Sequence, residues 1–120
     1  MSVRRGERWE AVAARYLESR GLSILARNFR CRLGELDLVC RDQDCVVIVE
    51  VRARAATSFA PALETIGWRK RRRIVQATRY LLLREPELRD RPLRFDVVAI
   101  DAIDTAEPEV VWIRHAFDAS

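Results

Sequence analysis

The sequence contains very little lysine and histidine and no long apolar run, and each of these features excludes some classes of protein. Lys70 is the only lysine among 22 basic residues, and His115 is the only histidine. No stretch approaches the roughly 20 consecutive apolar residues of a membrane-spanning helix, and the first ten residues lack the apolar region of a signal peptide. We therefore expect a cytoplasmic protein that has no membrane partner.

Cysteine and glycine are also scarce, with 3 and 4 residues. The cysteines are odd in number and have no CxxC spacing, which argues against zinc binding and against a disulfide framework; we expect Cys31, Cys40 and Cys45 to be reduced and mostly buried. No glycine-rich phosphate loop, nucleophile elbow or internal repeat is present. A lone histidine near a terminus is usually solvated, so we leave His115 out of any site.

What is abundant is arginine. The net charge is +4 and the isoelectric point is near 9.5, which favours an anionic partner such as nucleic acid. Five basic residues are consecutive from 69 to 73. Two interpretations of this run stay open: a solvated helix face, or phosphate contacts made by its arginines. These arginines are Arg69, Arg71, Arg72 and Arg73.

The apolar periodicity predicts two long helices and five strands in 120 residues, which we expect to form one domain, residues 1–120. The helices are expected at 7–20 and 66–84, and the strands near 22–32, 34–42, 45–54, 93–100 and 110–113. This order predicts an α/β fold with a mixed central sheet flanked by helices. We expect residues 55–61 to form a mobile loop beside the site.

The two strands between residues 34 and 54 carry the candidate chemistry. If the turn between them is Gln43-Asp44, then Asp37 lies opposite Glu50 and Glu35 lies opposite Arg52. Directly opposed residues have Cβ atoms roughly 4.5–5.5 Å apart, which lets both carboxylates bind one Mg²⁺. The alternative is a pair of surface acids neutralised by arginine. Because two charges about 5 Å apart repel by about 3 kcal/mol at an effective dielectric of 20, either Arg52 or a metal must supply a cation.

Three segments together resemble the YraN family: GELDL at 34–38, VEVRAR at 49–54 and RFDVV at 94–98. That family is similar to restriction-endonuclease-like nucleases and most nearly to archaeal Holliday junction resolvases. The resemblance implies a restriction-endonuclease-like fold and a Mg²⁺- or Mn²⁺-dependent endonuclease that acts on branched or structured DNA, with a homodimer expected of a true resolvase. It makes Asp37 and Glu50 metal ligands, with Glu10 and Glu35 as additional site residues. The residues alone favour another interpretation of Glu10, in which it is an ordinary helix acid that pairs with Arg8 or Arg15.

One position departs from the family pattern. Arg52 stands where the resemblance implies a lysine, and arginine stays protonated, so it can stabilise charge on a phosphate but cannot act as a base. Lys70 falls on the apolar stripe of the second helix; it either takes over the catalytic role or only packs its stem along apolar surface. If neither residue serves, a nucleic-acid-binding module without catalysis remains. A third alternative is an adaptor whose acids are paired with Arg52 and Arg54.

The segment at 94–98 contains a further acid, Asp96, in the middle of an expected core strand. A carboxylate in that position needs hydrogen-bond donors around it. We expect Asp96 to be structural, holding an arginine or a backbone group, and do not include it in the site.

Overall fold

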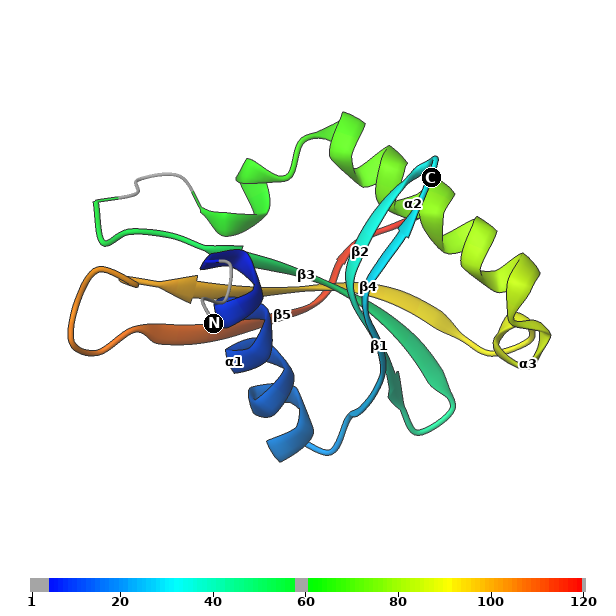
Figure 1. Ribbon diagram of the computed structural model, residues 1–120, viewed down its shortest axis with the longest axis horizontal. Helices are drawn as coiled ribbons and strands as arrows, with labels where there is room; N and C mark the ends of the chain where they lie inside the picture. Colours follow the sequence, from blue (N-terminus) through cyan, green and yellow to red (C-terminus); the bar gives the residue numbers. More distant parts are fainter. Residues whose placement is uncertain (1–4, 58–60, 120) are drawn as a thin grey trace.

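The computed structural model describes residues 5–57 and 61–119, which form one five-stranded sheet with helices packed against it (Figure 1). Along the chain the elements are α1 (Arg5–Ser19), β1 (Ser23–Cys31), β2 (Gly34–Asp42), β3 (Cys45–Ala53), the short 3-10 helix η1 (Ala62–Thr65), α2 (Trp68–Arg84), the one-turn helix α3 (Pro86–Arg89), β4 (Leu93–Asp101) and β5 (Glu109–Phe117).

The strands lie in the order β1-β2-β3-β4-β5. All neighbours are antiparallel except β3 and β4, which are parallel and are connected through η1, α2 and α3. A parallel pair requires such a crossover, because a tight turn can join only antiparallel strands. The predicted α/β architecture with a mixed central sheet is therefore confirmed, and it is compatible with a restriction-endonuclease-like fold.

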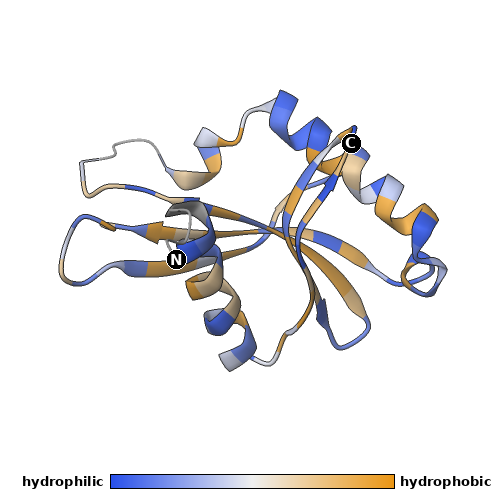
Figure 2. Ribbon diagram, viewed as in Figure 1, coloured by the Kyte–Doolittle hydropathy of each residue, from blue (hydrophilic) through white to orange (hydrophobic). Residues whose placement is uncertain are grey.

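The two long helices lie on different sides of the sheet (Figure 1). In β3, Val47 and Val49 pack in the cluster that contains the apolar residues of α1, whereas Val46 and Ile48 pack in the cluster that contains those of α2. A strand covered on both faces has no polar side, which explains the continuous apolar run of β3. Figure 2 shows the hydrophobic colour concentrated in the central strands and a hydrophilic stretch at the start of α2.

The helix boundaries follow local signals. Gly21, two residues after the last residue of α1, has a φ of 95°. The neighbouring Leu22 donates its backbone N–H to the carbonyl of Leu17 at 3.1 Å, so the helix ends near this glycine, as the sequence predicts. The predicted start of the second helix at 66 is wrong by two residues. Ile66 is extended and 1% exposed, because its side chain fills the core beneath η1, and α2 begins after Gly67.

Three further differences concern short segments. The helices η1 and α3 were not expected from the sequence, and the last strand runs to Phe117 instead of stopping near Ile113. That strand continues because Phe117 stacks on Phe95 with ring centroids 5.1 Å apart. The expected mobile loop at 55–61 includes residues 58–60, which lie outside the described residues.

Asp96 is fully buried in β4 and connects this strand to β5. Its carboxylate accepts hydrogen bonds from Nε of Arg94 at 3.1 Å, from Nε1 of Trp112 at 2.9 Å and from the backbone N–H of His115 at 2.9 Å. Its four lone-pair sites are thus largely used. The prediction of a structural Asp96 is confirmed. The His115 ring lies at the surface, where its Nε2 is 2.9 Å from Oδ1 of Asp118.

The remaining expectations on composition can be compared with the fold directly. Cys40 is buried, Cys31 and Cys45 are half-buried, and all three are free thiols, as predicted. Burial raises the pKa of Cys40 to about 12, so this thiol is unreactive. In residues 5–57 and 61–119, no helix is both long enough and apolar enough to cross a membrane.

Candidate functional site

The candidate site lies where β2 and β3 separate. The two strands are paired from Asp42 and Cys45 at the turn to Leu38 and Val49, which confirms the predicted register. Pairing ends there, one position before Asp37 and Glu50 would have opposed each other. Instead, the backbone N–H of Val51 donates to Oδ2 of Asp37 at 2.9 Å. The Asp37 side chain thus satisfies a strand amide that the separation leaves without a backbone acceptor.

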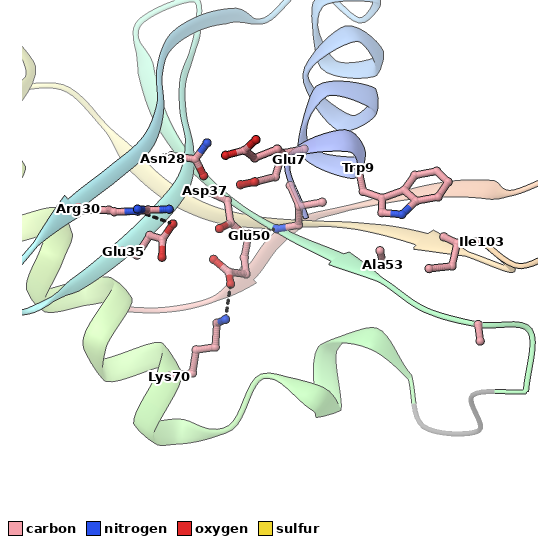
Figure 3. Close-up of a pocket in the computed structure, with 13 residues that line it drawn as sticks. Glu7, Trp9, Asn28, Arg30, Glu35, Asp37, Glu50, Ala53, Lys70 and Ile103 are labelled. Carbon is pink, nitrogen blue, oxygen red and sulfur yellow. Dashed lines mark hydrogen bonds and ion pairs between the residues drawn. The ribbon is translucent and has the colours of Figure 1, made fainter. Parts of the chain in front are cut away.

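A pocket of about 580 Å³ opens at this fork (Figure 3). Asp37 and Glu50 both line it, so the expectation that the two carboxylates point to the same side of the sheet is confirmed. Other acidic and polar residues come from α1, β1 and β2, and a lysine comes from α2. These residues are Glu7, Glu10, Asn28, Arg30, Glu35 and Lys70.

Glu50 is the buried acid of the pocket, with 3% of its surface exposed. Burial and the neighbouring charge of Asp37 raise its pKa to about 7, although Lys70 acts in the opposite direction. Burial also raises the pKa of Asp37, against the lowering effect of the Val51 N–H and of Lys70. The interaction of the two carboxyl groups raises the pKa of Glu50 and lowers that of Asp37, so a proton that the pair shares lies on Glu50. Two acids that share a proton are typical of sites that bind a cation or transfer protons.

The cation beside this pair is Lys70. Its Nζ lies 2.8 Å from Oε1 of Glu50, while 47% of its side chain remains exposed (Figure 3). The position of Lys70 in α2 brings it to the pocket because the neighbouring Ile74, one turn further along, is buried in the core. The lysine stem therefore bridges from the helix surface to the buried carboxylate.

Arg52 lies elsewhere. Its Nε donates to Oγ1 of Thr65 at 3.1 Å and its Nη2 to the Thr65 carbonyl at 3.4 Å, and it is not among the described residues that line the pocket. The expected opposition of Glu35 and Arg52 is wrong. Glu35 instead pairs with Arg30 of β1, whose Nε lies 3.2 Å from Oε1 of Glu35. It does not face Arg52 because β2 has already separated from β3 at this point.

Glu10 reaches the pocket from α1. With the side-chain amide of Asn28 oriented so that its nitrogen faces Glu10, this nitrogen donates to both carboxylate oxygens, at 2.8 and 3.2 Å. Burial, followed by repulsion from Asp37 and Glu35, raises the pKa of Glu10 to about 7. The preferred interpretation of an ordinary helix acid is wrong, since no ion pair of the described residues joins Glu10 to an arginine of its helix.

The adaptor alternative required the acids of the two strands to pair with Arg52 and Arg54. Nη2 of Arg54 instead lies 2.9 Å from Oδ1 of Asp101, and Arg52 binds Thr65. Glu50 lies 2.8 Å from Nζ of Lys70 and Glu35 pairs with Arg30, so the pairing of these acids with Arg52 that this alternative requires is not the one observed.

The basic run divides among three environments. Arg69 and Arg73 line a second groove of about 570 Å³, which shares Arg30, Glu35 and Lys70 with the acidic pocket. Arg72 is on the other side of the helix.

Arg71 differs from its neighbours because its guanidinium is part of the fold. Its Nε donates to the Ile66 carbonyl at 2.8 Å and its Nη2 to the Leu63 carbonyl at 3.3 Å, and the group lies over the ring of Phe117. Because the two carbonyls hold the guanidinium against the fold, Arg71 is less free than its neighbours to turn toward a phosphate.

The donor set of the pocket suits a hard divalent ion. Among the described residues, no group of three or more His, Cys, Asp or Glu side chains is arranged to hold a metal. Mg²⁺ commonly uses only one or two carboxylates and completes its shell with water and substrate phosphates. Asp37 and Glu50 fit that mode of binding, and Lys70 neutralises Glu50 in this structure.

Sequence reasoning missed Asn28 and Arg30, which line the acidic pocket from β1. Asn28 has a φ of 52°, a conformation that Asn adopts more readily than most residues. A signal was available in the sequence: an Asn and an Arg two residues apart on a strand adjacent to Glu35 and Asp37 point to one face.

Comparisons with known proteins give a family and relatives. A family model described as an uncharacterised protein family, UPF0102, matches residues 9–100. A UPF0102 protein of Pseudomonas putida strain GB-1 is 45% identical over 116 residues, covering 97% of this chain and 94% of the relative. A UPF0102 protein of Pseudomonas fluorescens Pf-5 is 46% identical over 110 residues, covering 92% and 89%. One from Pseudomonas aeruginosa PAO1 is 44% identical over 116 residues, covering 96% and 93%. Their names state no activity.

Proposed function

Since the chain belongs to the uncharacterised family UPF0102, the YraN family that its motifs resemble, we propose a function from its geometry: a nucleic-acid-binding protein with a Mg²⁺- or Mn²⁺-dependent endonuclease site that hydrolyses phosphodiesters in branched or structured DNA. The observation that carries this proposal is the meeting of Asp37, Glu50 and Lys70 in one pocket, with Nζ of Lys70 at 2.8 Å from Glu50. Two acids and one amine are the groups that a metal-assisted phosphodiesterase needs.

Asp37 and Glu50 would hold the ion. When bound, Mg²⁺ supplies a positive charge that polarises the scissile phosphate and lowers the pKa of a bound water. The Val51 N–H fixes one oxygen of Asp37 at 2.9 Å and so orients the carboxylate before any ion arrives. Such preorientation reduces the reorganisation needed on binding.

Lys70 would take the role that the family pattern gives to the position of Arg52. Its ammonium is at the acid pair, and its flexible stem is half exposed, so it can move from Glu50 to a phosphate or to the attacking water. Arg52 would act as a positioning residue, since its bonds to Thr65 hold η1 shortly before α2 begins. The substitution at position 52 is thus compatible with an active site.

The basic groove beside the pocket supports an anionic substrate. Arg30, Arg69 and Arg73 line it, and it shares Lys70 with the acidic pocket, so a nucleic-acid backbone lying along the groove would place a phosphate at the acid pair. Contacts of this kind position the substrate without reading its sequence. Recognition would then depend on the shape of the nucleic acid.

The test is an incubation of purified protein with a four-way junction, a flap and a linear duplex in Mg²⁺, Mn²⁺ or chelator. Asp37→Asn is the matched control, because the amide oxygen can still accept from Val51 while the charge needed for the ion is gone. We expect metal-dependent cutting by the wild type and none by Asp37→Asn. Absence of cutting on every substrate and metal would remove the enzyme proposal.

The second candidate is a binding module for structured nucleic acid that does not cut. The ion pair between Lys70 and Glu50 favours it, because Glu50 is already neutralised without a metal. A mobility shift on branched DNA that is independent of metal and unaccompanied by cutting would select this candidate. The same samples also test the homodimer expected of a resolvase, by light scattering, and the proposed cytoplasmic location is tested by cell fractionation.

A further inference from the structure

The outer side of α2 carries an exposed tryptophan that the proposed site does not use. Trp68, the first residue of the helix, is 67% exposed. An exposed indole ring of this size offers a flat apolar face on which a ligand can stack. The guanidinium carbon of Arg69 lies 5.6 Å from the ring centroid and covers only part of the ring.

The surroundings of Trp68 are cationic. A groove of about 470 Å³ runs beside the ring, with Arg72 and Arg79 on its sides and Val75 within it. Both arginines are exposed. Asp118 is the only acid among the described residues that line this groove, and its carboxylate is 2.9 Å from Nε2 of His115. The charge of the groove is therefore complementary to an anion, and its ring offers a flat apolar face.

We propose that Trp68 is a stacking platform for an unpaired base of a single-stranded nucleic acid, with Arg72 and Arg79 contacting the adjoining phosphates. Base stacking on an aromatic ring together with basic side chains along the backbone is the general mode of single-strand binding. The inference rests on the nucleic-acid partner of the proposed function, but it needs no metal and no cleavage.

The position of Trp68 relative to the acid pair determines which substrates the platform favours. Trp68 and Lys70 are two residues apart, so they project roughly 200° apart around α2 and about 3 Å along it. A strand that reaches from the acidic pocket to Trp68 must pass over the first turn of the helix. A continuous duplex keeps its bases stacked inside, whereas a flap, loop or gap offers a free base. The platform therefore selects substrates with unpaired nucleotides beside the phosphate at the acid pair.

The experiment measures binding in chelator by fluorescence anisotropy. One labelled probe is a thymidine oligonucleotide, and the second is an abasic strand of equal length with the same phosphates. We expect Trp68→Ala to bind the thymidine strand roughly 5- to 150-fold more weakly, the range for loss of one stacked base, and the abasic strand as the wild type does. Trp68→Phe should retain most of the affinity. Leu83→Ala is the matched control, since Leu83 is 70% exposed on the same helix.

The outcomes separate this inference from the nuclease proposal. Equal loss on both probes in Trp68→Ala, or no loss on either, overturns the platform. An equal loss in Leu83→Ala also overturns it, because the effect is then a general one of exposed apolar surface. Wild-type protein that binds neither probe overturns the platform, whereas the nuclease proposal is decided by the cleavage assay on branched DNA. Base-dependent binding that requires Trp68, in a protein that cuts nothing, supports the platform and removes the nuclease.

Discussion

Nζ of Lys70 and Oε1 of Glu50 are 2.8 Å apart, so the only lysine of the chain forms an ion pair with the most buried carboxylate of the candidate site. The two residues come from α2 and β3, which are joined through η1. Their meeting depends on how closely α2 lies to the forked end of the sheet. The behaviour of this pair separates a working phosphodiesterase from a binding module.

Lys70→Ala is expected to lower metal-dependent cleavage by about 10²- to 10⁴-fold, the range for loss of a positioned acid or base. Binding of the same substrate in chelator should fall only slightly, because Arg30, Arg69 and Arg73 still line the groove. Single-turnover cleavage and anisotropy measure the two effects. Melting at pH 6, where Glu50 is protonated and does not need the ammonium, serves as the control for folding.

Arg52→Lys completes that comparison. Because Arg52 is bonded to Thr65 and does not line the pocket, restoring lysine at this position should change cleavage little while Lys70 is present. A large gain of cleavage in Arg52→Lys would show that the site depends on position 52 and that Lys70 is only a counter-ion of Glu50.

Stability should fall as the pH rises through the titration of Glu50. Its pKa is raised from 4.5 to about 7 by burial and by Asp37, so between these values the folded state holds a proton that the unfolded state has released. The free energy of unfolding therefore decreases across this window and is constant above it. Glu50→Gln removes this contribution, so the fall in the free energy of unfolding across this window should be smaller by on the order of 1–3 kcal/mol.

Urea unfolding of the wild type and Glu50→Gln at pH 5 and pH 8 measures the difference. Glu64→Gln, at an exposed position of η1, is the control for the loss of a carboxylate as such. Identical pH dependence in the wild type and Glu50→Gln would show that Glu50 is ionised throughout and would remove the shared proton from the site.

Gly34 sets the distance between the forked end of the sheet and α2. A Cβ at this position would lie 2.8 Å from the carbonyl oxygen of Arg73, whose backbone would have to move. Gly34→Ala should destabilise the fold by about 1–3 kcal/mol and draw Lys70 away from Glu50, so cleavage should fall more than binding. Gly67→Ala, where an added Cβ meets nothing within 4 Å, should cost less than about 1 kcal/mol. Equal effects of the two substitutions on unfolding and cleavage would contradict this account.

The hairpin and its register could be predicted from the sequence because they are local. Gln43-Asp44 permits a tight turn, and strict alternation fixes every pair from Asp42 and Cys45 outward. The end of that pairing could not be predicted in the same way. It depends on the separation of β2 from β3. Because of this separation, Glu35 pairs with Arg30 and the Asp37 side chain accepts a hydrogen bond from the Val51 N–H.

The helices show the same division between local and tertiary signals. The inward position of Lys70 follows from its spacing to Ile74, which the sequence contains. The structural role of Arg71 does not follow from the sequence, because its partners are the carbonyls of Leu63 and Ile66 in a segment with no periodic pattern. A run of consecutive charges therefore does not by itself indicate which of its side chains are available to a partner.

The last prediction uses this difference between Arg71 and Arg72. Each phosphate contact on duplex DNA contributes about 0.9 to the slope of log affinity against log salt. Arg72→Ala should flatten the slope by about 0.9 with little change in stability, and the double variant Arg72→Ala, Arg73→Ala should flatten it by about 1.8. Arg71→Ala should leave the slope unchanged but lower the free energy of unfolding by about 1–3 kcal/mol, because two carbonyls lose their charged donor.

Anisotropy titrations on one duplex between 50 and 200 mM salt, conditions under which such slopes are large, measure the slopes, and urea unfolding measures the stabilities. The two arginines are adjacent and carry the same charge, so a general effect of lost charge would flatten both slopes equally. That result would show the run to act as a diffuse positive field. An unchanged slope in the double variant would show it to be a solvated helix face, whereas a flattened slope confined to Arg72 and Arg73 would locate the phosphate contacts on these side chains.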